Sequence, residues 1–184
     1  MNNITIKKIT IFIITIILIS CNTKSPTNVS KIDILDGSYD LKVFSKESFD
    51  LIGFKFSKEY NVEKLPDAVS AYYGFWGEGS YERLSYELRF YSSHKAAEAS
   101  GSFFAEEVTG ENAILKKADA TWKEGIKDRS GSEFFGSLVP KYLDYVIFGN
   151  VIVLCPSEKS SAVRDVWNPI ENCRKMLTKI TNLE

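Results

Sequence analysis

The chain has 184 residues, of which 23 are Lys or Arg, 24 are Asp or Glu, and 13% are aromatic. This length suits one ordinary domain with a sizeable core. The formal net charge of −1 is not the basic surplus that nucleic-acid binding needs, so we expect no nucleic-acid partner.

The first twenty residues have the pattern of an export signal. Lys7 and Lys8 provide a positive start without any acid, and the apolar run 9–19 follows. A run of this length is typical of a signal peptide and is shorter than the about 20 residues that cross a bilayer. We predict that residues 1–20 are a lipoprotein signal peptide that is cleaved.

The apolar run ends in Leu18-Ile19-Ser20-Cys21, which resembles the lipobox of bacterial lipoproteins. The resemblance implies a Cys21 thiol that carries acyl chains such as palmitate, cleavage before Cys21, and acylation of the new amine. Two or three chains hold firmly, because each buried CH₂ contributes about 0.8 kcal/mol. It thus predicts a cell-envelope protein, lipid-anchored on the extracytoplasmic side, with inner or outer membrane undetermined. The alternatives are an ordinary signal peptide or an uncleaved anchor.

Cleavage would leave 184 − 20 = 164 residues with a charge of 21 − 24 = −3. Residues 21–34 comprise the lipidated Cys and a flexible tether, since residues 22–31 are polar and contain Pro26. We predict that residues 35–184 form a single α+β domain.

The first half of this domain contains a short helix and a hairpin. Ser45 precedes a helix over residues 46–52, and Gly53 suits the position after its end. Residues 68–76 and 81–91 are expected to be strands joined by the Gly-rich loop 77–80. In the second strand, apolar side chains alternate with Ser85, Glu87 and Arg89, which is typical of a strand with one buried face.

A helix is predicted from Ser92 to Val108, with an apolar or small stripe at helical spacing. Gly101 lies inside the stripe and costs about 1 kcal/mol relative to Ala, which close approach of the helix to the sheet would compensate. Gly110 suits the position that closes the helix.

The last third begins with a second hairpin, over residues 142–148 and 151–155, because Gly149-Asn150 is a strong two-residue turn signal. A helix over residues 158–167 is expected next. Asn168 then looks like the N-cap of a terminal helix that begins with a proline. Together the segments predict an α+β fold: a mostly antiparallel sheet of four to five strands with helices packed on one face.

Two cysteines remain besides Cys21. Cys155 ends a strand, and Cys173 lies on the face of the terminal helix that points at the sheet. Outside the cytoplasm disulfides persist, so we predict a Cys155–Cys173 bond, which would stabilise the fold by about 3 kcal/mol. The alternative is a pair of buried free thiols.

No catalytic constellation stands out. His94 is the one histidine and is interpreted as a residue at a helix start. Short signatures of serine nucleophiles, phosphate loops and zinc hydrolases are missing, although paired carboxylates leave no such signature. We assign no catalytic residue, metal or cofactor, and whether the chain is an enzyme stays uncertain, leaning towards no.

Five residues are candidates for a ligand-facing site. Lys123 and Arg129 would bind an anion while Trp122 stacks on a ring; the alternative is a solvated turn with Trp122 docked on the core. Tyr73 and Trp76 belong to an aromatic run that would line a groove. Alternate strand residues face opposite ways, so Tyr73 and Trp76 should lie on opposite faces.

Two stretches of the sequence resemble an uncharacterised domain of exported bacterial proteins. They are residues 106–129, in which segments 107–111 and 121–125 carry the resemblance, and residues 145–155. The resemblance implies a shared fold and no activity. We therefore expect a non-enzymatic module that binds a small molecule or a peptide at the membrane. The alternatives are a structural or assembly lipoprotein that docks another envelope protein and, third, an envelope hydrolase.

Overall fold

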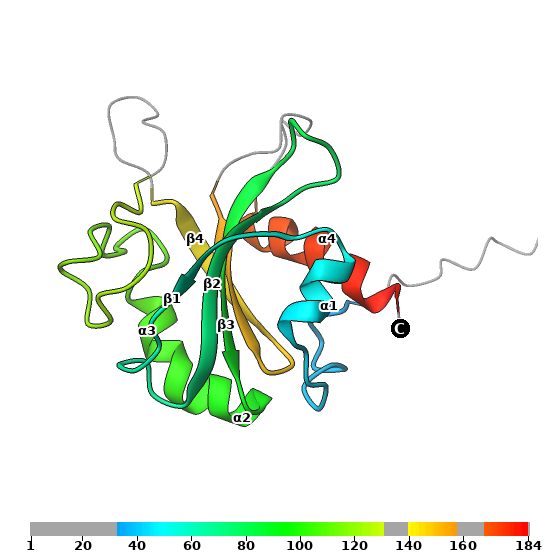
Figure 1. The fold of residues 1–184 in the computed structure, drawn as a ribbon, viewed down its shortest axis with the longest axis horizontal. Coiled ribbons are helices and arrows are strands. Elements are labelled where there is room, and N and C mark those ends of the chain that lie inside the picture. The colour runs from blue at the N-terminus through cyan, green and yellow to red at the C-terminus, as the bar shows by residue number, and fades with distance from the viewer. Residues whose placement is uncertain (1–32, 131–139, 158–167, 184) are drawn as a thin grey trace, which may run out of the picture. The chain divides into compact units, whose positions relative to one another are not determined.

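The computed structural model describes residues 33–130, 140–157 and 168–183. Residues 32–184 form one compact unit. It contains a five-stranded antiparallel sheet in the order β1-β2-β3-β5-β4 (Figure 1). Its strands are β1 (Lys55–Tyr60), β2 (Ala68–Trp76), β3 (Leu84–Tyr91), β4 (Tyr142–Phe148) and β5 (Val151–Pro156). Both predicted hairpins, β2–β3 and β4–β5, are present.

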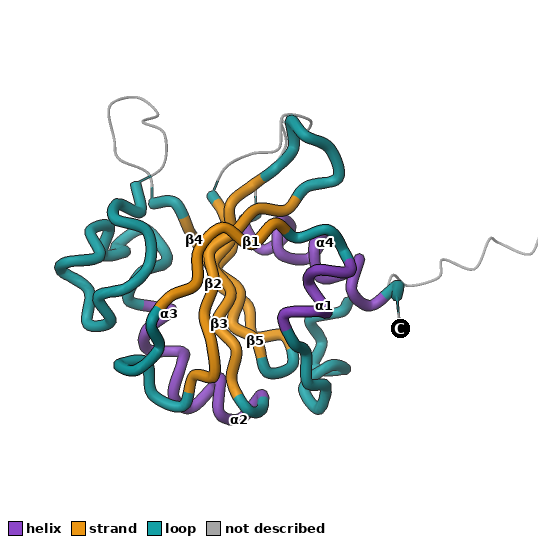
Figure 2. The backbone as a smooth tube through the Cα atoms, viewed as in Figure 1, coloured by secondary structure: helices purple, strands orange, loops and turns teal. Residues whose placement is uncertain are grey.

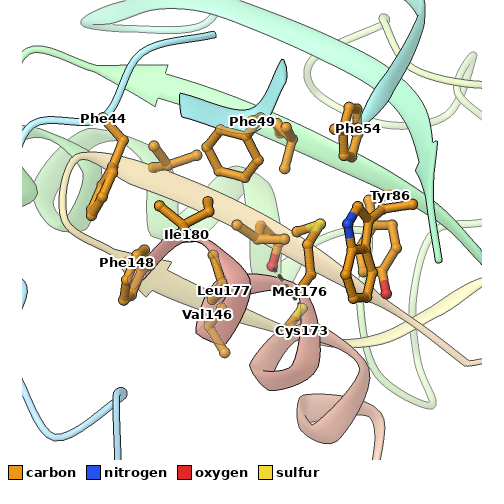
Figure 3. Packing of buried hydrophobic residues seen from close by; sticks show 14 of the residues in the cluster. Phe44, Phe49, Phe54, Tyr86, Val146, Phe148, Cys173, Met176, Leu177 and Ile180 are labelled. Carbon is orange, nitrogen blue, oxygen red and sulfur yellow. Dashed lines mark hydrogen bonds between the residues drawn. The ribbon is translucent and has the colours of Figure 1, made fainter. Parts of the chain in front are cut away.

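One face of the sheet packs against two helices, α1 (Lys46–Leu51) and α4 (Pro169–Thr181). Both helices begin as expected: Ser45 is the N-cap of α1, and the Asn168 side chain accepts a hydrogen bond from the amide of Ile170 at 3.0 Å. Figure 3 shows Met176 and Leu177 of α4 within the apolar core that also includes Phe49 of α1.

The other face is covered by a helical segment and by the long loop that follows it (Figure 2). The segment comprises α2 (His94–Ala96), a π-helical turn η1 (Ala97–Gly101) and α3 (Ser102–Glu106). Gly101 lies against β5: a Cβ there would be 2.5 Å from Cδ1 of Ile152. The close approach of helix to sheet predicted from Gly101 is therefore confirmed.

The predicted α+β class and antiparallel sheet are confirmed, and two details differ. Strand β1, with Lys55, Lys58 and Glu59, was not predicted, since as a charged edge strand it lacks apolar alternation. The helices, expected on one face, are divided between both faces. The physical reason is that the polar side of β3 is buried too, which requires a second covering layer.

Cys155 and Cys173 lie at disulfide distance, with their Cα atoms 5.4 Å apart. The predicted juxtaposition of these residues is present, because α4 packs across β5. The signal peptide, Cys21, most of the tether and the helix expected over residues 158–167 lie outside the described residues. Among the residues that are described, no helix is long and apolar enough to span a membrane.

Candidate functional site

A row of buried polar side chains lies on the second face of the sheet. Ser85, Glu87 and Arg89 of β3 face away from α1 and α4, and none is more than 3% exposed. The alternation predicted for this strand is correct. What the alternation could not indicate is that its polar side lies beneath a second layer.

Glu87 and Arg89 form an ion pair that is completely buried. Nε and Nη2 of Arg89 donate to Oε1 of Glu87 at 2.9 and 2.7 Å. The Arg89 guanidinium also lies 4.9 Å from the centre of the Trp122 ring, a distance at which a cation is attracted to the face of an indole. The Trp122 ring therefore packs against this ion pair.

A second guanidinium, that of Arg129, reaches the same place from the covering loop. Arg129 is fully buried, and its Nη2 donates to the carbonyl of Glu124 at 2.7 Å. A Cβ on Gly125 would collide with Nη2 of Arg129 and would lie 3.3 Å from Oε2 of Glu87. Gly125, at φ +106°, thus lets Arg129 approach the Glu87 carboxylate.

Three tyrosine hydroxyls surround the charges. Burial raises the pKa of Tyr91 to about 12, and burial together with the Glu87 charge raises the pKa of Tyr60 and of Tyr142 above the usual value. These hydroxyls stay protonated at neutral pH, so none of them neutralises a guanidinium. We call Glu87, Arg89, Arg129, Tyr60, Tyr91 and Tyr142 the buried cluster.

The buried cluster is incompletely paired. Two guanidiniums face one carboxylate, which leaves one positive charge in excess. Among the described residues, the atoms of the buried cluster without a hydrogen-bond partner are the three hydroxyls, Oε2 of Glu87, Nη1 of Arg89, and Nε and Nη1 of Arg129; the neighbouring Ser85 hydroxyl also has none. Buried polar groups are normally paired, and leaving one unpaired costs about 1–3 kcal/mol. Such a group of atoms needs an explanation beyond packing.

A pocket of about 310 Å³ lies on the outer side of Trp122. Charges of both signs surround it; its lining residues are Asn61, Glu63, Lys64, Trp122, Lys123 and Glu124. The Trp122 indole N–H donates to the Asn61 carbonyl at 3.2 Å, and the ring meets Tyr60 edge-on at 6.0 Å. Trp122 therefore contacts both the pocket and the buried cluster.

The structure brings four of the five ligand-facing candidates to this face. Trp122 and Lys123 line the pocket, Arg129 lies beneath it, and Tyr73 packs against the apolar residues around Trp122. Trp76 lies on the opposite face, as the alternation of β2 predicted, and its indole N–H donates to the Ile52 carbonyl at 3.1 Å. Trp76 is therefore not part of this site.

Sequence reasoning missed Glu87 and Arg89 as site residues. Both were interpreted as the polar side of a strand, and nothing local distinguishes a solvated Glu-x-Arg from a buried one. His94 begins α2 as predicted, with Nδ1 2.9 Å from the Gly149 carbonyl oxygen. Across the described ranges, no group of three His, Cys, Asp or Glu side chains is placed to hold a metal ion.

Residues 45–182 match the DUF6810 family, which is described as a family of unknown function. No curated protein and no solved structure matches the chain. Since the match covers more than half of the sequence, the chain belongs to the DUF6810 family. This membership agrees with the resemblance to an uncharacterised domain and assigns no activity.

Proposed function

We propose that this member of the DUF6810 family is a non-enzymatic ligand-binding module of the cell envelope, held at the membrane by a lipid on Cys21. Its ligand is a small molecule that occupies the pocket beside Trp122. The membrane part of the proposal is supported by the lipobox-like tetrapeptide that ends at Cys21.

The observation that carries the binding part is the position of Trp122. Trp122 lines a polar pocket, and its ring also contacts the Arg89 guanidinium. Ligand sites typically combine an aromatic wall with a few polar groups that fix orientation. The polar residues that a ligand in this pocket would meet are Asn61, Glu63, Lys64, Lys123 and Glu124.

Native mass spectrometry of the full chain, exported in a bacterial host and kept in neutral detergent, tests the proposal. We expect extra mass that vanishes on denaturation. Lys64→Ala, at the pocket, should reduce the extra mass, whereas Lys95→Ala, an exposed lysine of α2, should not. A native mass with no bound ligand, or a bound mass that Lys64→Ala does not reduce, would contradict the proposal.

A second candidate is an assembly lipoprotein that docks an envelope protein through β4. Strand β4 is at the edge of the sheet and contains a single charged residue, Asp144. Edge strands without protective charges are templates for pairing with another chain, and the opposite edge, β1, carries three charges. Under this candidate Leu143→Lys, at a partly exposed position of β4, would abolish co-purification of a partner while leaving the ligand load unchanged.

A further inference from the structure

We propose that the buried cluster is a carboxylate-binding site, which takes the acidic end of the ligand whose remainder occupies the Trp122 pocket. This inference rests on the proposed function and specifies the chemical class of the ligand, which is that of organic monocarboxylates.

The charge of the buried cluster calls for one negative charge. Arg89 and Arg129 are permanently cationic and fully buried, while Glu87 is the one carboxylate among the described residues that faces them. An uncompensated charge in a protein interior is strongly unfavourable. A monoanion would cancel the excess, whereas a phosphate dianion would replace a surplus of +1 with one of −1.

The unpaired atoms are mostly donors. Nη1 of Arg89, and Nε and Nη1 of Arg129, have no acceptor among the described residues. Each of these nitrogens can donate one charge-assisted hydrogen bond to a carboxylate oxygen, so a carboxylate between the two guanidiniums would be held by both arginines. The buried hydroxyls of Tyr60 and Tyr142 are further donors without a partner among the described residues.

Trp122 controls access from the pocket to the buried cluster. The side chain is 3% exposed, its ring contacts Tyr60 and the Arg89 guanidinium, and its one side-chain hydrogen bond goes to the Asn61 carbonyl. Apart from the single bridge between Lys116 and Asp128, residues 109–129 of the covering loop belong to no helix or strand. A rotation of the Trp122 side chain would therefore join the pocket to the guanidiniums without disturbing the sheet.

Saturation-transfer NMR on the full chain in neutral detergent, after exhaustive dialysis to remove bound ligand, tests this site, with acetate and its neutral analogue acetamide present together. We expect transfer to the acetate methyl group and not to that of acetamide. Arg129→Met should abolish the acetate signal, whereas Arg83→Met, which removes an exposed arginine, should leave it intact. Arg129→Lys retains the charge without the fixed donor positions of the guanidinium and should weaken acetate binding about tenfold.

Equal signals from acetate and acetamide, no acetate signal in the wild type, or an acetate signal that survives Arg129→Met would overturn the carboxylate site. If Arg129→Met does not fold, the wild-type comparison and Arg129→Lys still decide. The two proposals fail separately. A neutral molecule found bound by native mass spectrometry and lost in Lys64→Ala would retain the pocket and overturn the carboxylate site alone.

Discussion

Glu87 is the carboxylate that faces two buried guanidiniums. Replacing it with Gln keeps the size of the side chain and raises the excess charge from one to two. Breaking a buried ion pair in this way costs about 3–5 kcal/mol. We therefore expect Glu87→Gln to lower the free energy of unfolding by that amount, measured by urea denaturation. Glu82→Gln, at an exposed position, is the matched control, and equal midpoints for the two variants would contradict the account.

The buried tyrosines predict a loss of stability in alkali. The pKa of Tyr91 is raised by burial to about 12, against about 10 in an unfolded chain. The contribution is complete below pH 10 and is lost as the pH rises towards 12, because the unfolded state releases its proton first. Each such tyrosine contributes a slope of about 1.4 kcal/mol per pH unit.

Denaturant titrations between pH 9 and about 11.5 measure this slope. Tyr91→Phe should reduce this slope by the contribution of one titrating proton. Tyr81→Phe, which removes an exposed hydroxyl, is the control and should leave the slope unchanged. A free energy of unfolding that stays flat across this range would show that the hydroxyls of the buried cluster are solvated.

At the scale of elements, Gly101 sets the distance between the helical segment and β5. A Cβ there would meet Cδ1 of Ile152 and the Tyr91 hydroxyl, both at 2.5 Å. Overpacking of this kind costs about 1–3 kcal/mol, which exceeds the gain of about 1 kcal/mol from Ala in a helix.

We therefore expect Gly101→Ala to lower the midpoint of urea unfolding. Gly79→Ala is the control, because nothing lies within 4 Å of a Cβ at that position. A Gly101→Ala variant that is more stable than the wild type would mean that helix propensity outweighs contact with the sheet.

The pair Cys155 and Cys173 links α4 to β5 across 18 residues of sequence. If the pair is oxidised, the denatured mass of the chain is about two units below the reduced value. The Cys155→Ala, Cys173→Ala double variant should then lose about 3 kcal/mol. A wild-type chain that has the reduced mass after export would favour the alternative of two free thiols.

Most elements could be predicted because their signals are local. The turn at Gly149-Asn150, the caps at Ser45 and Asn168 and the alternation of β3 each need only a few neighbouring residues. The site could be predicted only in part, since Trp122 and Arg129 stand out in a charged loop. Their partners Glu87 and Arg89 are about 40 residues away in sequence, and only the folded sheet brings them beneath that loop.

At the scale of the whole molecule, the proposed membrane attachment depends on Cys21, whereas the ligand site does not depend on that residue. We expect Cys21→Ala to release the protein from the membrane fraction, because no acyl chain can attach, while the thermal unfolding of the domain stays unchanged. Fractionation of cells followed by immunoblotting measures the first effect. Continued tight membrane association of the variant would contradict the lipoprotein proposal.

The central claim is that the domain holds a small acidic ligand between Trp122 and the two buried arginines. Identifying what the native, full-length chain releases on denaturation tests this claim most directly. The account predicts about one equivalent of an organic carboxylate, detected in negative-ion mode and absent from Arg129→Met but not from Arg83→Met. A stoichiometric neutral compound, or a native mass equal to that of the lipidated chain alone, would contradict it.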